Sequence, residues 1–313
     1  MLNGPIETET RYQDQLVEQW NIVVPTLTIL RVLEPIEQGI MLSIYNGNSE
    51  PISRGNRRLN WLNVKAVLFD FADTLVNTER FDYDKCLRKI VQSLGKNGIS
   101  VPFKSFKRGY FDSRDRFYKK TEKTLEEQNF AERIIETLRS CSVYVSSEDE
   151  RIREAAEAFC NCFAMSLTID SYLPSLLEQL HKKYKLAVVS NMSFAEAIFQ
   201  SLREFNIVNY FDAVIVSGIL GWRKPNPKIF KKALQTLDVK AKEAAFVGDS
   251  PRADIEGARK LGMKTVLLIE KRKKPPITDT AQFYSTEGKS NVKPDRTIRK
   301  LANVERALRL LSK

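Results

Sequence analysis

The chain has 313 residues, of which 42% are hydrophobic and 28% are charged, and its formal net charge is +11. A chain of this length and composition can bury a sizeable core, in one large domain or two small ones, and it has no run near the roughly 20 apolar residues of a membrane span. Its first residues lack the basic start and apolar stretch of a secretory signal.

The four cysteines do not have the spacing of a zinc site. Cys160 and Cys162 are two residues apart, and side chains at that spacing diverge on a helix. We therefore predict free, buried thiols. With no secretory signal, these thiols favour a reducing, cytoplasmic location.

Residues 1–61 differ from the rest of the chain, because prolines, glycines and asparagines interrupt their short apolar runs. We treat them as an N-terminal extension of undefined structure. From Leu62 the pattern is regular, and nearly continuous apolar runs predict strands of a parallel sheet that is buried on both faces. These runs are Val64–Phe69, Leu186–Val189, Ala213–Val216, Ala244–Val247 and Thr265–Ile269.

Helical patterns separate the last four runs, at Ala195–Phe205, Pro227–Leu237 and Ile255–Leu261. Alternating strands and helices predict an α/β core with a doubly wound parallel sheet, formed by residues 62–77 and 166–270. In such a sheet the ligand binds at the carboxyl ends of the strands.

More than a hundred residues separate the first two predicted strands. Residues 78–165 are predicted to form an all-helical cap, because apolar residues recur there at a spacing near 3.6. The expected helices are Phe81–Leu94, Phe103–Tyr118, Leu125–Leu138 and Glu148–Met165. An insertion beside the strand ends would act as a lid that excludes water and shapes the substrate pocket.

The C-terminal segment, residues 271–313, has 12 lysines and arginines against 4 acidic residues. We interpret it as a basic, solvated segment that ends in a helix. Binding to nucleic acid is not expected, since no aromatic residues are interleaved with the basic ones and no nucleic-acid-binding module is recognisable. The sequence does not indicate an oligomeric state.

Reactive side chains follow the predicted strands. Asp70, Ser190 and Asp249 each lie at the end of a buried apolar run, Asp254 follows five residues after Asp249, and Lys224 adds an ammonium group. A carboxylate nucleophile, a hydroxyl, an ammonium and an acidic pair suit the Mg²⁺-assisted transfer of a phosphoryl group through an aspartyl intermediate.

Four segments in this order and spacing resemble the haloacid dehalogenase superfamily of hydrolases and phosphotransferases. The resemblance covers roughly residues 62–270, the insertion resembles the first type of cap in that family, and Pro294–Leu301 resembles its closing strand-to-helix segment. The four segments are Asp70-Phe71-Ala72-Asp73-Thr74, Val188-Val189-Ser190-Asn191, Arg223-Lys224-Pro225-Asn226-Pro227, and Gly248-Asp249-Ser250 with Asp254 and Ile255-Glu256-Gly257-Ala258.

The resemblance implies a role for each matching position. Asp70 would attack phosphorus, Ser190 and Lys224 would bind the phosphoryl group together with Asn191 and Thr74, and Lys224 would also neutralise the nucleophile. Mg²⁺ would be held by Asp70, the backbone oxygen of Ala72, Asp249 and Asp254. A carboxylate that attacks an anionic ester needs its repulsion removed, and Mg²⁺ and Lys224 supply two cations for this purpose.

Ala72 departs from the family pattern, in which phosphatases usually have a second aspartate two positions after the nucleophile. That side chain protonates the leaving oxygen, a contribution worth roughly 10²–10⁴-fold in rate. Four alternatives stay open. Asp73, where the family usually has glycine, could be a substitute acid; a substrate group or a cap residue could serve instead; or the chain could bind a phosphorylated ligand with little or no turnover.

The fourth alternative is phosphonate cleavage, since relatives that cleave phosphonoacetaldehyde have alanine at this position and use a cap lysine as a Schiff base. Candidate lysines are Lys104, Lys107, Lys119, Lys120 and Lys123. Dehalogenase activity is disfavoured by the acidic pair, because those relatives need no metal. The sequence therefore predicts a Mg²⁺-dependent phosphatase that acts on a small phosphorylated metabolite.

Overall fold

A computed structural model describes residues 64–269 and 290–311 of the protein. The described residues all fall within one compact unit, Asn63–Ser312. The predicted N-terminal extension and residues 271–289 and 312–313 of the basic segment lie outside the described residues.

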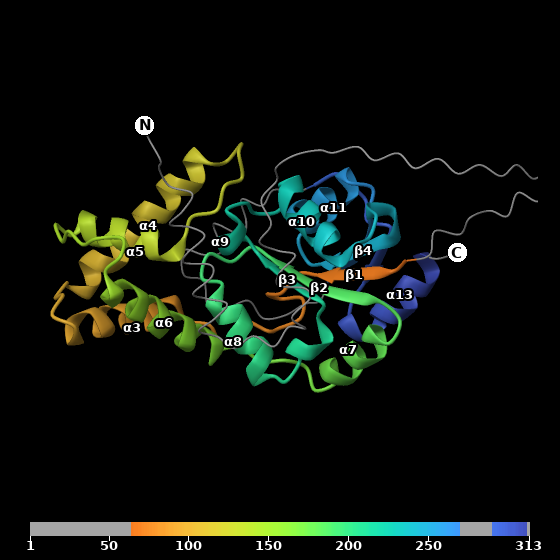
Figure 1. Ribbon diagram of the computed structural model, residues 1–313, viewed down its shortest axis with the longest axis horizontal. Coiled ribbons are helices and arrows are strands. Elements are labelled where there is room, and N and C mark those ends of the chain that lie inside the picture. Colours follow the sequence, from red (N-terminus) through yellow and green to blue (C-terminus); the bar gives the residue numbers. More distant parts are fainter. Residues whose placement is uncertain (1–63, 270–289, 312–313) are drawn as a thin grey trace, which may run out of the picture. The chain divides into compact units, whose positions relative to one another are not determined.

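The described residues form a six-stranded parallel sheet with the strand order β3-β2-β1-β4-β5-β6 (Figure 1). This confirms the predicted α/β class and all five predicted strands to within two residues at either end, and β6 falls inside Pro294–Leu301. The strands are β1 (Ala66–Phe69), β2 (Lys185–Ser190), β3 (Ala213–Val216), β4 (Ala244–Gly248), β5 (Lys264–Leu268) and β6 (Arg296–Ile298).

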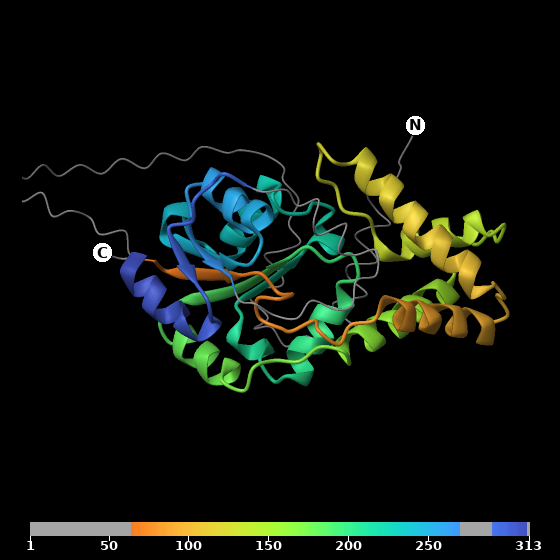
Figure 2. The same ribbon diagram turned by 180° about the vertical axis from the view of Figure 1, so that it is seen from behind.

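Helices cover both faces of the sheet, with α10 and α11 on one face and α7 and α13 on the other (Figures 1 and 2). Alternate strand residues divide between the two faces: Leu68 packs in the cluster that contains α10, and Phe69 in the cluster on the opposite face. Burial on both faces explains why the strands are continuous apolar runs in the sequence.

The helices of this α/β core fall mostly where the sequence predicted them, and short 3₁₀ turns join several of them. They are α7 (Leu173–His181), α8 (Glu196–Glu204), α9 (Ser217–Leu220), α10 (Pro227–Leu237), a π-helical turn (Pro251–Glu256), α11 (Gly257–Lys260) and α13 (Val304–Leu311), with 3₁₀ turns at Val208–Tyr210, Ala241–Glu243 and Leu301–Asn303.

Four helices lie between β1 and α7, as predicted for the insertion. They are α3 (Tyr83–Lys96), α4 (Phe103–Lys120), α5 (Phe130–Ser140) and α6 (Glu150–Ala164). The prediction that the third helix begins at Leu125 is wrong. Leu125 has a left-handed backbone with φ of +60°, and the helix begins after Asn129, whose side chain accepts a hydrogen bond from the backbone of Ala131. The intervening residues pair with the core instead, as described below.

Aromatic side chains join this insertion to the core. The rings of Phe130, Phe159 and Phe163 each lie within 5.3 Å, between centroids, of the ring of Phe194. Phe194 follows β2 by four residues and is buried. Aromatic pairs at these distances add to the free energy gained from their burial. The insertion therefore packs directly beside the loop that follows β2.

The two ends of the insertion meet at its base. Asn77 and Thr168 exchange backbone hydrogen bonds of 2.7 and 3.2 Å in an isolated antiparallel bridge. All four cysteines are free, as predicted, although Cys141 is only half-buried. Among the described helices, none combines the length and the apolar character needed to cross a membrane.

Candidate active site

The predicted site residues lie at one edge of the sheet, where neighbouring parallel strands end. Asp70 follows β1, Ser190 ends β2 and Asp249 follows β4. The register brings them level, since Phe69 pairs with Val188 on one side and with Val247 on the other. The backbone of Asp70 continues this pairing with a 2.9 Å hydrogen bond to Val247.

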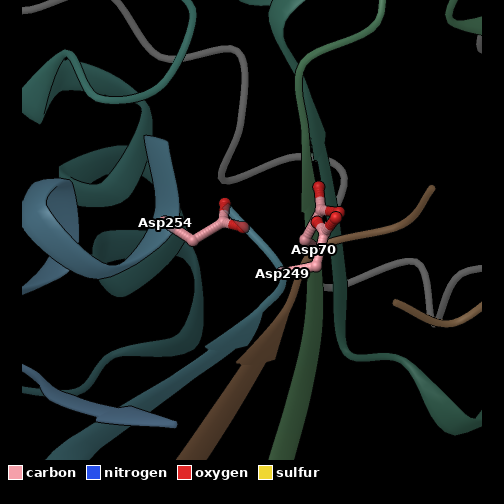
Figure 3. Close-up of side chains that lie close together, drawn as sticks. All are labelled: Asp70, Asp249 and Asp254. Carbon is pink, nitrogen blue, oxygen red and sulfur yellow. The ribbon is translucent and has the colours of Figure 1, made fainter. Parts of the chain in front are cut away.

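Three carboxylates meet at this edge. The nearest oxygens of Asp70, Asp249 and Asp254 all lie within 4.8 Å of one another (Figure 3). Asp254 comes from the π-helical turn after β4, and its side chain extends toward the other two (Figure 3). Its Oδ2 accepts a 2.9 Å hydrogen bond from the backbone of Ser250, which fixes the direction of the carboxyl group.

Gly248 makes room for this arrangement. A Cβ at this position would overlap the carboxyl group of Asp254. A glycine is therefore required by the close approach of the backbone and the Asp254 side chain, whatever the local dihedral angles.

Lys224 joins two of the three carboxylates. Its Nζ lies 2.6 Å from Oδ1 of Asp70 and 2.8 Å from Oδ1 of Asp254, and only 2% of its side chain is exposed. Burial alone would lower the pKa of this ammonium group, but the charges of Asp254 and Asp70 and hydrogen bonds to both raise the pKa above its ordinary value. Lys224 is therefore a fixed cation.

The pKa values of two of the acidic groups are also raised, and in both of them burial is the largest cause. The pKa of Asp254 is raised to about 7, with burial as the largest cause; the charge of Lys224 opposes the rise and that of Asp70 adds to it. The pKa of Asp249 also lies well above its ordinary value, first because of burial and then because of the charges of Asp70 and Asp254. Three ionised carboxylates beside one ammonium leave an excess of negative charge at a site in which Asp70, Asp254 and Lys224 are buried.

The loop after β2 is tied to the loop that contains Lys224. The side-chain oxygen of Asn191 accepts a 2.6 Å hydrogen bond from the backbone N–H of Lys224, and its nitrogen donates one of 3.0 Å to the backbone oxygen of Lys224. Asn191 was predicted to bind phosphate together with Ser190, and in the structure its side chain holds the Lys224 backbone. Sequence reasoning missed this contact, since an asparagine after a strand has no pattern that names its partner.

The turn after Asp70 contains the remaining predicted residues. Ala72 forms a bridge with Val76, and Asp73 has a φ of +58°, a conformation that aspartate tolerates better than most residues. Oδ1 of Asp73 accepts a 2.6 Å hydrogen bond from the hydroxyl of Thr78. The hydroxyl of Thr74 is buried and makes no hydrogen bond within the described residues, so it is available to a ligand.

These residues could hold a hard divalent cation. Carboxylate oxygens are the ligands that Mg²⁺ prefers, and the converging oxygens of Asp70, Asp249 and Asp254 suit an ion that also retains water and takes a substrate oxygen. A cation at this position would offset the excess negative charge. The fit of Mg²⁺ to this site therefore rests on the three carboxylate donors and on the negative charge that they leave uncompensated.

Comparison with known proteins agrees with this geometry. A model of the haloacid dehalogenase-like hydrolases matches residues 64–262. The chain belongs to this family. A protein from Pyrococcus abyssi named glyceraldehyde 3-phosphate phosphatase is 28% identical over 206 residues, which are 65% of this chain and 80% of that protein. A phosphoserine phosphatase from Thermus thermophilus is 33% identical over 37% of this chain and 47% of its own length.

Solved structures of haloacid dehalogenase-like proteins share the fold. A 2-haloacid dehalogenase from Pseudomonas syringae pv. Tomato DC3000 superposes with a TM-score of 0.57 at 24% identity, over 79% of this chain and 99% of that one. A HAD phosphatase from Thermococcus onnurineus gives a TM-score of 0.52 at 22% identity, over 78% and 98%. The two neighbours are named for different activities, so the likeness concerns architecture alone.

Proposed function

We propose that this haloacid dehalogenase-like hydrolase is a Mg²⁺-dependent phosphatase that acts on a small phosphorylated metabolite in a reducing cytoplasm. The contact of Lys224 with Asp70 at 2.6 Å, beside Asp249 and Asp254, carries the proposal. Relatives that are named phosphatases support the reaction class, and the acidic cluster supports the metal. Helices α3–α6 act as the lid.

The reaction would proceed in two steps on Asp70. Its carboxylate attacks phosphorus, the bond from phosphorus to the ester oxygen breaks, and an aspartyl phosphate forms on the side chain. Water then attacks this phosphate, which releases inorganic phosphate and restores the carboxylate. Mg²⁺ held by Asp70, Asp249, Asp254 and the Ala72 backbone oxygen would stabilise the charge that develops on the phosphoryl oxygens.

Three polar groups would bind the phosphoryl group besides the metal. Lys224 neutralises it from the side of Asp254, the hydroxyl of Ser190 donates to it, and the buried hydroxyl of Thr74 supplies a donor that has no other partner among the described residues. Asn191 contributes through its backbone, since its side chain is committed to Lys224.

Substrate choice follows from Ala72. Without a carboxyl group at this position, protonation of the leaving oxygen loses assistance worth roughly 10²–10⁴-fold, so esters with good leaving groups are favoured. The contact of Asp73 with Thr78 favours a structural role for Asp73 over that of a substitute acid. The acid would then come from the substrate itself or from the cap.

A weakly active protein that binds a phosphorylated ligand is the second candidate, because the absent acid would slow release of an alkoxide. Phosphonate cleavage has less support. The Schiff-base chemistry needs a desolvated amine, whereas Lys104, Lys119, Lys120 and Lys123 are exposed and Lys107 pairs with Asp84 at 2.8 Å.

Hydrolysis of p-nitrophenyl phosphate with Mg²⁺ and with EDTA tests the proposal, because this leaving group needs little protonation. We expect metal-dependent turnover that Asp70→Asn abolishes while leaving the fold intact. Equal rates for wild type and Asp70→Asn would reject the phosphatase and favour the binding protein.

A further inference from the structure

A strap from the helical insertion lies against the loop that contains Lys224. We use this name for residues Thr124–Glu127. The backbone of Arg223 donates to the oxygen of Leu125, and that of Glu127 donates to the oxygen of Gly221, both at 2.9 Å. The side chain of Asn226 donates at 2.9 Å to the oxygen of Thr124. The segment on either side of Lys224 is therefore held from the insertion.

The strap has an unfavourable backbone of its own. Leu125 is held at a φ of +60°, in a region that a residue with a branched side chain seldom adopts. Such outliers persist only where surrounding contacts determine them, and they concentrate at clamps and switch regions. Here the hydrogen bond from Arg223 is one of those contacts. The conformation of the strap thus depends on its pairing with the core.

Glu127 ends the strap with a buried carboxylate. Its side chain is 2% exposed. Its Oε1 accepts hydrogen bonds from the hydroxyl of Tyr118 at 2.7 Å and from the backbone of Gln128 at 3.1 Å, and the guanidinium of Arg133 lies 3.8 Å away. Burial and the charge of Glu127 raise the pKa of Tyr118, so its hydroxyl stays a donor. These contacts lie within the insertion.

The second oxygen of Glu127 contacts the core. Oε2 accepts a 3.0 Å hydrogen bond from the hydroxyl of Ser217, the first residue of α9. The same hydroxyl accepts a 2.8 Å hydrogen bond from the backbone N–H of Met192. Because an amide N–H is only a donor, Ser217 must use its lone pair for Met192 and its single proton for Glu127. Glu127 therefore orients the hydroxyl that holds Met192.

Met192 lies two residues after Ser190, and Gly218 binds the backbone oxygen of the same residue. The backbone of Gly218 donates at 3.0 Å to the oxygen of Met192, and a Cβ at Gly218 would overlap the backbone at Met192 and Ser193. The loop after β2 thus has one anchor through Asn191 on Lys224 and another through Met192 on Ser217. The insertion contacts the elements at both anchors.

We propose that Glu127 is a positioning residue that couples the helical insertion to the phosphoryl-binding loops. Through Ser217 it sets the loop that follows Ser190, while the strap sets the loop around Lys224. Both loops reach their working geometry only when the insertion is docked. The consequence for catalysis rests on the proposed phosphatase function, whereas the coupling itself does not.

A purely structural role for Glu127, as the counter-ion of Arg133, makes a different prediction. That role uses Oε1 and stays within the insertion, whereas the proposed role uses Oε2 and reaches Met192. Glu127→Asp keeps the charge opposite Arg133 but withdraws the carboxylate by one methylene from Ser217. Glu127→Gln keeps the length but removes the charge. Exposed Glu122, in the same segment, provides the matched control Glu122→Gln.

The amide of Met192 is a direct probe of this coupling. The full chain has five methionines, so labelling with [¹⁵N]methionine gives a simple spectrum in which Met192→Leu assigns one resonance. In Glu127→Gln and Glu127→Asp we expect that resonance to move and its hydrogen exchange to accelerate about ten-fold, the loss expected for one weakened hydrogen bond. Met263, bonded to the backbone of Ala258, should be unchanged.

A Met192 resonance that stays in place with unchanged exchange in folded Glu127→Asp would overturn the proposal. If Glu127→Gln fails to fold, Glu127→Asp alone decides, since it retains the buried charge pair. If the wild type is active, the affinity for the inhibitor orthovanadate, a phosphoryl mimic, should fall about ten-fold in both variants. It should not change in Glu122→Gln. A wild-type protein without activity would reject the proposed phosphatase function, and the Met192 spectrum would still test the coupling.

Discussion

Lys224 donates a 2.6 Å hydrogen bond to Asp70, a residue 154 positions earlier in the chain. The same nitrogen contacts Asp254 at 2.8 Å, so one buried cation contacts two buried carboxylates. Breaking a buried ion pair by removing one partner leaves an uncompensated charge, which is far more costly than losing an exposed pair. Lys224 therefore contributes to folding stability as well as to the proposed chemistry.

Lys224→Met should lower kcat/KM by at least about 10²–10³-fold, the loss typical of one removed transition-state donor. It should also lower the free energy of unfolding by about 3–5 kcal/mol in EDTA. Activity assays and urea unfolding measure the two effects. Lys182→Met removes an exposed pair with Glu178 and should change neither by much. Full activity in folded Lys224→Met would contradict the assigned role.

Ala72→Asp should restore the missing acid. We expect little change in the hydrolysis of p-nitrophenyl phosphate and a gain of about 10²-fold or more for an alkyl phosphate, because only the alkoxide leaving group needs protonation. The measurement is the ratio of kcat/KM for the two substrates. Equal gains for both would indicate that position 72 acts through the metal and not through proton transfer.

Asp73→Asn should leave alkyl phosphate hydrolysis close to that of the wild type. The amide oxygen can still accept the hydrogen bond from Thr78, and asparagine also tolerates the left-handed backbone at this position. A loss of about 10²-fold or more that is confined to poor leaving groups would instead make Asp73 the substitute acid. The rate of p-nitrophenyl phosphate hydrolysis serves as the internal reference.

Asp254 should make stability depend on pH in the metal-free protein. Its pKa is about 7 in the folded chain and is 3.8 ordinarily. Between these values the folded state holds a proton that the unfolded state has lost, so raising the pH through this window lowers the free energy of unfolding. The full difference corresponds to about 4 kcal/mol as an upper bound.

The comparison with Asp254→Asn isolates this effect, because asparagine does not titrate. Urea unfolding in EDTA should show the stability of wild type falling relative to the variant from pH 4 to pH 7. Mg²⁺ should reverse the trend, since a bound cation favours the ionised carboxylate. A constant difference between the two proteins over this range would show that Asp254 titrates normally.

Gly248→Ala should displace the Asp254 carboxyl group, because the added Cβ overlaps it. We expect a loss of about 1–3 kcal/mol in stability from overpacking and weaker binding of Mg²⁺. Gly95→Ala is the matched control: Gly95 lies in α3, and a Cβ there would meet nothing within 4 Å. The control should gain up to about 1 kcal/mol from helix propensity. Unfolding curves without Mg²⁺ measure the change in stability, and the added stability in Mg²⁺ measures the binding of the ion.

The sheet was predictable from the sequence because its strands are buried on both faces and so are continuous apolar runs. Leu68 and Phe69 pack on opposite faces, and no polar position interrupts the run. The same rule located Asp70, Ser190 and Asp249 at one edge, since parallel strands present their carboxyl ends together. Asp254 followed from its spacing after Asp249.

Contacts between distant segments could not be predicted in this way. Leu125 has good helix propensity, yet it has a left-handed backbone and accepts a hydrogen bond from Arg223, about a hundred residues later. Asn191, Glu127 and Ser217 also obtain their roles from partners that periodicity does not reveal. Local pattern thus located the groups proposed to react, whereas the groups that orient them required the folded chain.

The bridge between Asn77 and Thr168 marks the boundary between the helical insertion and the core. Because the chain leaves and re-enters the core through this one pair, the number of residues beyond it places no strain on the strands. A helical segment of another length or sequence could be joined across the same pair without moving the strands. Such an exchange would have to rebuild both the strap contacts and the aromatic packing of the insertion on Phe194.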